Sequence, residues 1–180
     1  MTALSQEEQS IQRWLKKAPR FNLKGRSFWR CIERTFAATA LESGPNFSQP
    51  SRYSISEEFS ALYLSESQAL ARLEKTQGED DYEPLADLCF RFTAKAEVPD
   101  LSDQKTQASL LGTLGIDPRD LTVPGIDGYR RTHPIARAAF HSGLLGFLAP
   151  SVHPVRGSDP GWRNLVVYSA NVVQGLLDRQ

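Results

Sequence analysis

The most constraining feature of this sequence is a run of alternating apolar and polar residues between positions 88 and 95. Leu88, Phe90, Phe92 and Ala94 recur at every second position, which is the period that places side chains on one face of a β-strand. The run therefore predicts a half-exposed strand with these apolar side chains turned inward.

Further strand patterns lie on both sides of this run and are interrupted by helical patterns. Aromatic and β-branched residues cluster at 27–33, 61–64, 144–148 and 164–168, and each cluster predicts a strand. Helical patterns cover the region after Ser5 as far as residue 18, the region from Ser67, two short stretches within 102–123, and a short C-terminal segment. Because strands and helices mix without a regular strand–helix–strand order, we predict an α+β fold, a mixed sheet with flanking helices.

Capping signals set the expected starts of two helices. Ser5 and Glu8 have the spacing of a capping box, and Ser65 and Gln68 form a second candidate pair. Residues 43–54 are rich in turn formers and predict a loop long enough to carry function, and the acidic stretch 78–81 predicts a turn.

A third helix start is expected at Thr132-His133-Pro134, because proline suits the first helical turn. The helix would end at Gly143, a residue type that favours the C-terminal cap. His133 is then best explained as a neighbour of the cap and not as a base.

Glu74 occupies a position where the helix pattern calls for an apolar residue. Helical periodicity groups it with Leu70, Leu73 and Gln77 on one stripe, so its side chain should point towards packed protein. A half-buried carboxylate either has a buried partner or acts on a substrate in a cleft. From this segment alone, the commoner outcome is a Glu at the helix edge that extends to solvent.

Composition excludes several classes of protein. The chain has 180 residues and a net charge of zero, which predicts one domain (21–180) with a short N-terminal helical extension (1–20) and no affinity for nucleic acid. No apolar run is long enough to span a membrane, and no secretory leader is visible. Cys31 and Cys89 lack metal-ligand spacing and lie within apolar runs, so we expect buried free thiols and a cytoplasmic protein.

No phosphate-binding glycine loop, metal-ligand set or nucleophile elbow is present in the sequence. What remains is a set of polar residues near predicted strands, around one possible cleft: Arg30, Arg52, Tyr63, Glu74 and Ser151. Each has a structural alternative. Arg30 fits the surface of an edge strand, Tyr63 fits the core, and Ser151 fits a turn.

With these residues in place, the chain resembles the RES-domain family, the toxins of bacterial toxin–antitoxin pairs named for an Arg, a Glu and a Ser. The matching pieces, in order, are Phe28-Trp-Arg30, Ser51-Arg52-Tyr53, the segments 62–67 and 69–74, the segment 143–151 and the segment 164–168. The resemblance extends from about residue 26 to residue 170. Many members have a Gly-Gly-Arg-Trp-Asn-like run where this chain has Gln49-Pro-Ser-Arg52-Tyr53-Ser, and the first 20 or so residues have no counterpart.

The resemblance implies an ADP-ribosyltransferase-like fold that consumes NAD, with a helix-turn-helix (Xre-like) antitoxin as partner. The family's arginine, glutamate and serine correspond to Arg30, Glu74 and Ser151, and its second arginine and its tyrosine to Arg52 and Tyr63. On this basis Glu74, Arg30 and Ser151 are the expected catalytic residues.

The chemistry of NAD fits these residue types. A pyrophosphate needs an arginine fork, a pyridinium ring needs an aromatic face, and the ribose needs a carboxylate. We therefore expect Arg30, Arg52, Tyr63 and Ser151 to bind NAD, and Glu74 to stabilise the positive charge that develops at the ribose. Ser151 would orient Arg30 or a phosphate oxygen, because no histidine is placed to activate it as a nucleophile.

Three functions follow from this interpretation. The first is cleavage of the nicotinamide–ribose bond of NAD, with water or phosphate as acceptor, by a toxin held inactive by its antitoxin. The second keeps the fold and makes the acceptor a protein side chain, as in a mono-ADP-ribosyltransferase. The third is a catalytically silent interaction module, against which the presence of Arg30, Glu74 and Ser151 argues.

Overall fold

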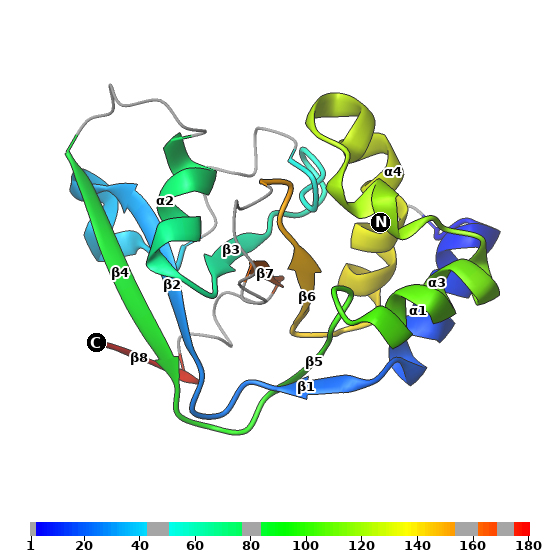
Figure 1. Ribbon diagram of the computed structural model, residues 1–180, viewed down its shortest axis with the longest axis horizontal. Helices are drawn as coiled ribbons and strands as arrows, with labels where there is room; N and C mark the ends of the chain where they lie inside the picture. The colour runs from blue at the N-terminus through cyan, green and yellow to red at the C-terminus, as the bar shows by residue number, and fades with distance from the viewer. Residues whose placement is uncertain (1–2, 43–50, 77–83, 154–161, 169–174) are drawn as a thin grey trace.

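The computed structural model describes residues 3–42, 51–76, 84–153, 162–168 and 175–180. Its centre is a six-stranded sheet in the order β6-β7-β3-β2-β4-β8, in which all neighbouring strands are antiparallel (Figure 1). The strands are β2 (Ser27–Glu33), β3 (Leu62–Ser65), β4 (Leu85–Phe92), β6 (Gly146–Pro150), β7 (Arg163–Val167) and β8 (Leu177–Arg179). A separate two-stranded sheet pairs β1 (Arg20–Asn22) with β5 (Glu97–Pro99).

The helices gather mainly at one end of the sheet. Figure 1 shows α1 (Gln6–Lys17), α3 (Gln104–Leu114) and α4 (Gly125–His141) beside β6, whereas α2 (Gln68–Thr76) lies at the other end between β3 and β4. Two short 3₁₀ helices complete the described elements, η1 (Arg34–Thr39) and η3 (Pro118–Thr122). The predicted α+β class with flanking helices is confirmed. The sheet was expected to be mixed, and its described strand pairs are all antiparallel.

The strand predicted from alternation is the eight-residue strand β4. Leu88, Phe90 and Phe92 are buried as expected, whereas Ala94 lies beyond the end of the strand and is half-buried. Strand β2 pairs with β4 along its whole length, with Phe28 opposite Phe90. The bounds predicted for β2, 27–33, are those of the structure.

Side chains from both faces of β6 are buried, so the sheet separates two cores. Phe147 and Ala149 pack into the cluster that contains the apolar faces of α1, α3 and α4, whereas Leu148 packs into the cluster that contains Phe28 and Phe90. This two-sided burial explains why the sequence around β6 is continuously apolar instead of alternating.

Helix α1 is part of the first core. The Ser5–Glu8 capping box is present, with Ser5 Oγ accepting from the Glu8 amide at 3.2 Å and Glu8 Oε2 accepting from the Ser5 amide at 2.7 Å. Ile11 and Leu15 are fully buried against the other helices. The division into residues 1–20 and 21–180 remains a prediction.

The expected start of α4 at Thr132 is wrong. The helix begins at Gly125, which puts Pro134 inside it. Proline cannot donate to the carbonyl four residues earlier, so its presence in a helix interior opposes helix formation. Four buried residues that follow within two turns, Ile135, Ala136, Ala138 and Ala139, stabilise the helix against this effect. Gly143 does follow the helix end, with a positive φ of 68°.

Two smaller predictions also fail. Ser65 is not a helix cap, because it still belongs to β3; the Oγ of Ser67 accepts from the Leu70 amide at 3.2 Å and takes that position instead. Cys31 is buried as expected, but Cys89 is only partly buried; both thiols are free.

In the described part of the expected C-terminal helix, residues 175–180, the chain forms strand β8 instead, which pairs with the edge of β4 and brings Leu177 opposite Phe92. The predicted turn at 78–81, the loop residues 43–50 and residues 169–174 lie outside the described part of the chain. Within the described part, no helix is long and apolar enough to cross a membrane.

Candidate active site

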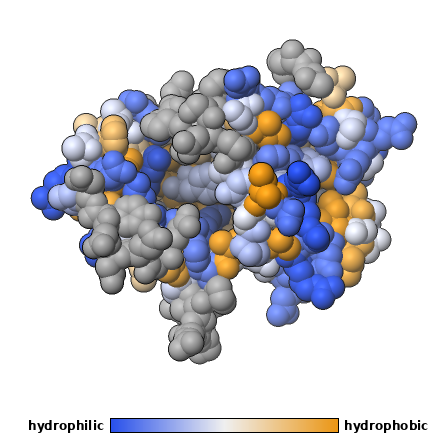
Figure 2. Space-filling view, turned by 90° about the horizontal axis from the view of Figure 1, so that it is seen from above, coloured by the Kyte–Doolittle hydropathy of each residue, from blue (hydrophilic) through white to orange (hydrophobic). Residues whose placement is uncertain are grey.

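A cavity of about 490 Å³ opens between α2 and the first turn of α4. Figure 2 shows the surface hollowed on this side, with hydrophilic and intermediate residues along the hollow. Four of the five predicted site residues line the cavity. The full lining is Trp29, Arg30, Cys31, Ser51, Arg52, Tyr53, Tyr63, Ser65, Ala71, Glu74, Lys75, Pro124, Gly125, Tyr129, Pro150, Val152, His153 and Asn164.

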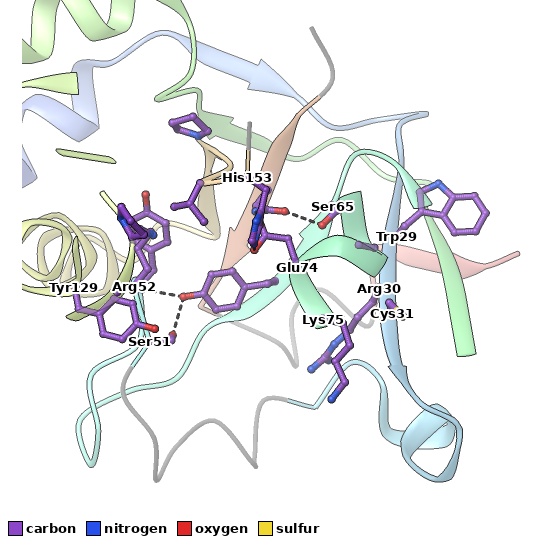
Figure 3. Close-up of a pocket in the computed structure, with 18 residues that line it drawn as sticks. Trp29, Arg30, Cys31, Ser51, Arg52, Ser65, Glu74, Lys75, Tyr129 and His153 are labelled. Atoms are coloured by element: carbon purple, nitrogen blue, oxygen red, sulfur yellow. Dashed lines mark hydrogen bonds and ion pairs between the residues drawn. The ribbon is translucent and has the colours of Figure 1, made fainter. Parts of the chain in front are cut away.

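Glu74 lies at the middle of this cavity (Figure 3). Its Oε1 accepts from the Ser151 hydroxyl and from the Asn164 amide nitrogen, both at 2.6 Å. The side chain is 28% exposed, so it faces the cavity and does not extend into open solvent. The helix-edge alternative is therefore wrong. Glu74 has a buried partner, Asn164, and it lines a cleft, whereas its action on a substrate stays a prediction.

The Asn164 amide is itself fixed from behind. Ser65, at the end of β3, donates its hydroxyl to Asn164 Oδ1 at 2.7 Å (Figure 3). Both residues are buried and lie directly opposite each other in the β3–β7 ladder. With its oxygen bonded to Ser65, the amide can present only its N–H groups to Glu74.

Ser151 belongs to the same arrangement, but with a different partner from the predicted one. Its hydroxyl donates to Glu74, not to Arg30, and its Oγ accepts from the backbone N–H of His153 at 3.0 Å. The His153 imidazole also faces the carboxylate, with Nε2 3.6 Å from Glu74 Oε2. A histidine therefore does lie near Ser151, although it contacts the hydroxyl only through its main chain.

Arg30 lies to one side of Glu74, next to Lys75 (Figure 3). Burial lowers the pKa of its guanidinium to about 10, because desolvation disfavours the charged form. Its Nη1 donates to the carbonyl oxygens of Ala40 and Glu42. Since a guanidinium carries five N–H donors, an anion in the cavity can still be bound by the others.

Arg52 lies on the opposite side of Glu74, next to Tyr129 (Figure 3). It donates to the carbonyl oxygens of Leu121 and Val123, at 3.2 Å and 2.5 Å, and so fixes the chain that leads into α4. Gly128 allows this approach, because a Cβ there would lie 1.9 Å from the Val123 oxygen and 2.9 Å from Arg52 Nη1.

Tyr63 ties the loop that carries Arg52 to the sheet. Its hydroxyl shares a hydrogen bond of 2.8 Å with Ser51 Oγ and accepts from the Tyr53 amide at 2.8 Å. His133 reaches the same loop, with Nε2 2.9 Å from the Ser51 carbonyl oxygen. This histidine lies inside α4 and not at a helix start, so its predicted role as a cap neighbour is wrong.

Burial affects the pKa of two tyrosines that line the cavity, Tyr53 and Tyr63, and of Tyr168, which packs against the core. Burial raises the pKa of Tyr63 to about 12, and it raises the pKa of Tyr53 and of Tyr168 as well. The Tyr53 and Tyr168 hydroxyls are buried and have no hydrogen-bond partner within the described residues. All three therefore stay neutral well above physiological pH.

The arrangement brings a fixed carboxylate between two guanidinium groups and several aromatic rings, inside a partly enclosed space. This set can bind a phosphorylated ligand and stabilise positive charge on it. Asn164 and His153 are parts of it that the sequence interpretation missed. A polar residue at the start of the apolar run 164–168 was the available signal for Asn164. Among the described residues, no three His, Cys, Asp or Glu side chains are grouped as metal ligands.

Comparison with known proteins places this arrangement in a family. The model of the RES domain matches residues 27–178, which is most of the chain and includes every predicted site residue. The chain belongs to the RES-domain family. The resemblance drawn from five short motifs is thereby confirmed.

A solved structure supports the fold of this RES-domain protein. This protein is similar to a chain in the crystal structure of the M. tuberculosis MbcT–MbcA toxin–antitoxin complex, with a TM-score of 0.70 and 16% sequence identity. The match covers 99% of this chain and 91% of the other chain. At this identity the likeness shows a shared fold. No curated protein sequence matches the chain.

Proposed function

We propose that this RES-domain protein is an NAD-consuming enzyme that breaks the bond between nicotinamide and ribose, with water or phosphate as acceptor. The observation that carries the proposal is the Glu74 carboxylate, held in the cavity by Ser151 and Asn164. Breaking an N-glycosidic bond builds oxocarbenium-like positive charge on the ribose, and a fixed carboxylate beside it stabilises that charge.

The rest of the cavity supports NAD as the substrate. Arg30 and Arg52 flank Glu74 and supply positive charge for a pyrophosphate, and the aromatic rings of Tyr63 and Tyr129 are available to a planar base. A volume of about 490 Å³ falls within the range of small-molecule sites. Ser151 acts in this scheme by orienting Glu74, and it forms no covalent intermediate.

Family membership supports the biological role. We place this protein among toxins that arrest growth by depleting NAD in the bacterial cytoplasm, restrained by an antitoxin. The structural neighbour comes from a toxin–antitoxin complex. A helix-turn-helix, Xre-like protein encoded beside this chain is the partner we expect, and its co-expression should restore growth.

Incubation of purified protein with NAD tests the enzymatic proposal. Free nicotinamide without labelling of protein is the expected result. Transfer of labelled ADP-ribose to added cell proteins would instead support a mono-ADP-ribosyltransferase. If the folded protein produces neither, the chain is not an NAD-consuming enzyme and the interaction-module alternative gains support.

A further inference from the structure

His153 is a cavity residue to which the proposed reaction has so far given no role. Its side chain is 25% exposed, and its Nε2 lies 3.6 Å from Glu74 Oε2. That separation is too long for a direct hydrogen bond, but one oxygen atom beside the pair can contact both. The other carboxylate oxygen, Oε1, already accepts two hydrogen bonds, so only Oε2 and the imidazole remain to meet a reacting group on this side.

The segment that carries His153 is tied to the carboxylate twice. The backbone N–H of His153 donates to Ser151 Oγ, and the Ser151 hydroxyl donates to Glu74. The main chain therefore holds the imidazole at the site. Figure 3 shows His153 and Glu74 close together among the residues that line the cavity.

Other titratable and charged groups face the same cavity. They are Arg30 and Cys31 from β2, Arg52 and Tyr53 from the segment after residue 50, Tyr63 from β3, Glu74 and Lys75 from α2, and Tyr129 from α4.

Several of these groups are poor proton acceptors near neutral pH. The pKa of Tyr63 is raised to about 12 and that of Cys31 to about 11, in both cases mainly by burial, so each keeps its proton. Lys75 forms a salt bridge with Glu33, with Nζ 2.8 Å from Oε1, and Arg30 is a cation, so neither side chain accepts a proton. A neutral imidazole, in contrast, has a ring nitrogen with a free lone pair that can accept a proton.

We infer that His153 is the general base of the proposed reaction with water as the acceptor, and takes a proton from that water. The C1′–N bond breaks, and its electron pair leaves with neutral nicotinamide. A lone pair of the acceptor oxygen forms the new bond to C1′, and the proton from that oxygen moves to His153 Nε2. Glu74 stays ionised throughout and faces the positive ribose. This inference rests on the proposed function.

The test compares His153→Gln with wild-type protein between about pH 5 and pH 9. Glutamine keeps a polar side chain but does not titrate. We expect the wild-type kcat for nicotinamide release to fall on the acid side as the imidazole is protonated. The variant should lose this acid limb, and its kcat at neutral pH should be lower by roughly 10²- to 10⁴-fold with little change in KM. His141→Gln is the matched control, because His141 packs against Glu58 and not against the cavity.

Azide provides a second measurement that separates a base from a structural residue. Azide is anionic and attacks without losing a proton, so it should restore turnover in folded His153→Gln and form ADP-ribosyl azide. His153→Asn should behave in the same way, with an unfolding midpoint close to that of the wild type. An unchanged pH profile and kcat in both variants would overturn the role of His153, as would failure of azide to restore the folded variants. Wild-type protein that releases no nicotinamide would overturn the proposed function itself, and this inference with it.

Discussion

At the scale of single residues, the hydrogen bonds around Glu74 explain how a carboxylate is kept on an otherwise apolar helix stripe. Its two donors, Ser151 and Asn164, lie 77 and 90 positions away in the sequence. Each donor is fixed by a further group, Ser151 by the His153 amide and Asn164 by the Ser65 hydroxyl. The carboxylate is thus oriented before any ligand arrives, which is the condition for electrostatic catalysis.

Ser151→Ala removes one of these donors. Because its partner is a carboxylate, the lost hydrogen bond is worth about 1.5–3 kcal/mol, so activity should fall by roughly one to two orders of magnitude while the fold persists. Nicotinamide release and thermal unfolding measured on the same sample check both parts. A covalent ADP-ribosyl adduct on Ser151, found by mass spectrometry of wild-type protein quenched during turnover, would instead make this serine a nucleophile.

Ser65→Ala tests the support behind Asn164. The substitution leaves the buried Asn164 oxygen without its donor, so the amide that donates to Glu74 is no longer held in place. We expect a loss of stability of about 1–3 kcal/mol and a lower kcat with little change in KM. Ser65→Thr keeps the hydroxyl and should recover most of the activity. Equal losses in the alanine and threonine variants would mean that Ser65 acts through packing alone.

The sequence allowed the residues that line the cavity with charged groups to be predicted better than the residues that support them. Arg30, Arg52 and Glu74 stand out because a charge interrupts an apolar or turn-rich pattern. Asn164 and His153 do not stand out, because their importance comes from contacts between distant segments. The positioning role expected for Ser151 stays a prediction, and its hydrogen-bond partner, Glu74, could be identified only from tertiary structure.

At the scale of elements, the segment that leads into α4 holds Arg52 through the carbonyl oxygens of Leu121 and Val123, close to Gly128 in the first turn of the helix. Glycine in a helix normally destabilises it relative to alanine by about 0.5–1 kcal/mol, so a Gly→Ala change usually stabilises. At Gly128 the sign should reverse, because the added Cβ would overlap the Val123 oxygen and approach Arg52. We expect Gly128→Ala to destabilise by about 1–3 kcal/mol.

Gly112 in α3 offers the matched control. It also lies within a helix, but an added Cβ there would have no atom within 4 Å. Urea unfolding should show Gly112→Ala slightly more stable than the wild type and Gly128→Ala clearly less stable. Similar stability of the two variants would mean that the packing of Arg52 on α4 does not need glycine.

Strand β2 and the alternating part of β4 were predictable because their patterns are local and agree with their burial. The start of α4 was not predictable. Pro134 is a strong local signal for a helix start, and the buried face of the longer helix overrides it. Strand β8 was missed for a similar reason, since three residues carry little pattern and their strand structure depends on pairing with the edge of β4.

At the scale of the whole molecule, the site exists only when the sheet is complete. Arg30 comes from β2, Glu74 from α2, Asn164 from β7 and Ser151 from the end of β6. The order of the strands brings β7 and β3 together, so that Ser65, Asn164 and Glu74 meet. Loss of activity should therefore accompany global unfolding.

The buried tyrosines predict how the whole molecule responds to alkali. A tyrosine in the unfolded chain ionises near pH 10, whereas burial raises the pKa of Tyr63 to about 12. Stability is therefore fully present below about pH 10 and should fall as the pH rises towards 12. Tyr63→Phe should reduce the slope of unfolding free energy against pH in this window by up to about 1.4 kcal/mol per pH unit. Urea midpoints at several pH values test this, and an unchanged slope would contradict it.

The most direct test of the central claim is the turnover of NAD by Glu74→Gln. Glutamine keeps an oxygen that can accept from Ser151 and Asn164, so the fold and NAD binding should persist while the negative charge is removed. We predict a kcat for nicotinamide release lower by roughly 10²- to 10³-fold, with NAD affinity by calorimetry nearly unchanged. Near-normal turnover in the folded variant would show that Glu74 is structural and would contradict the account.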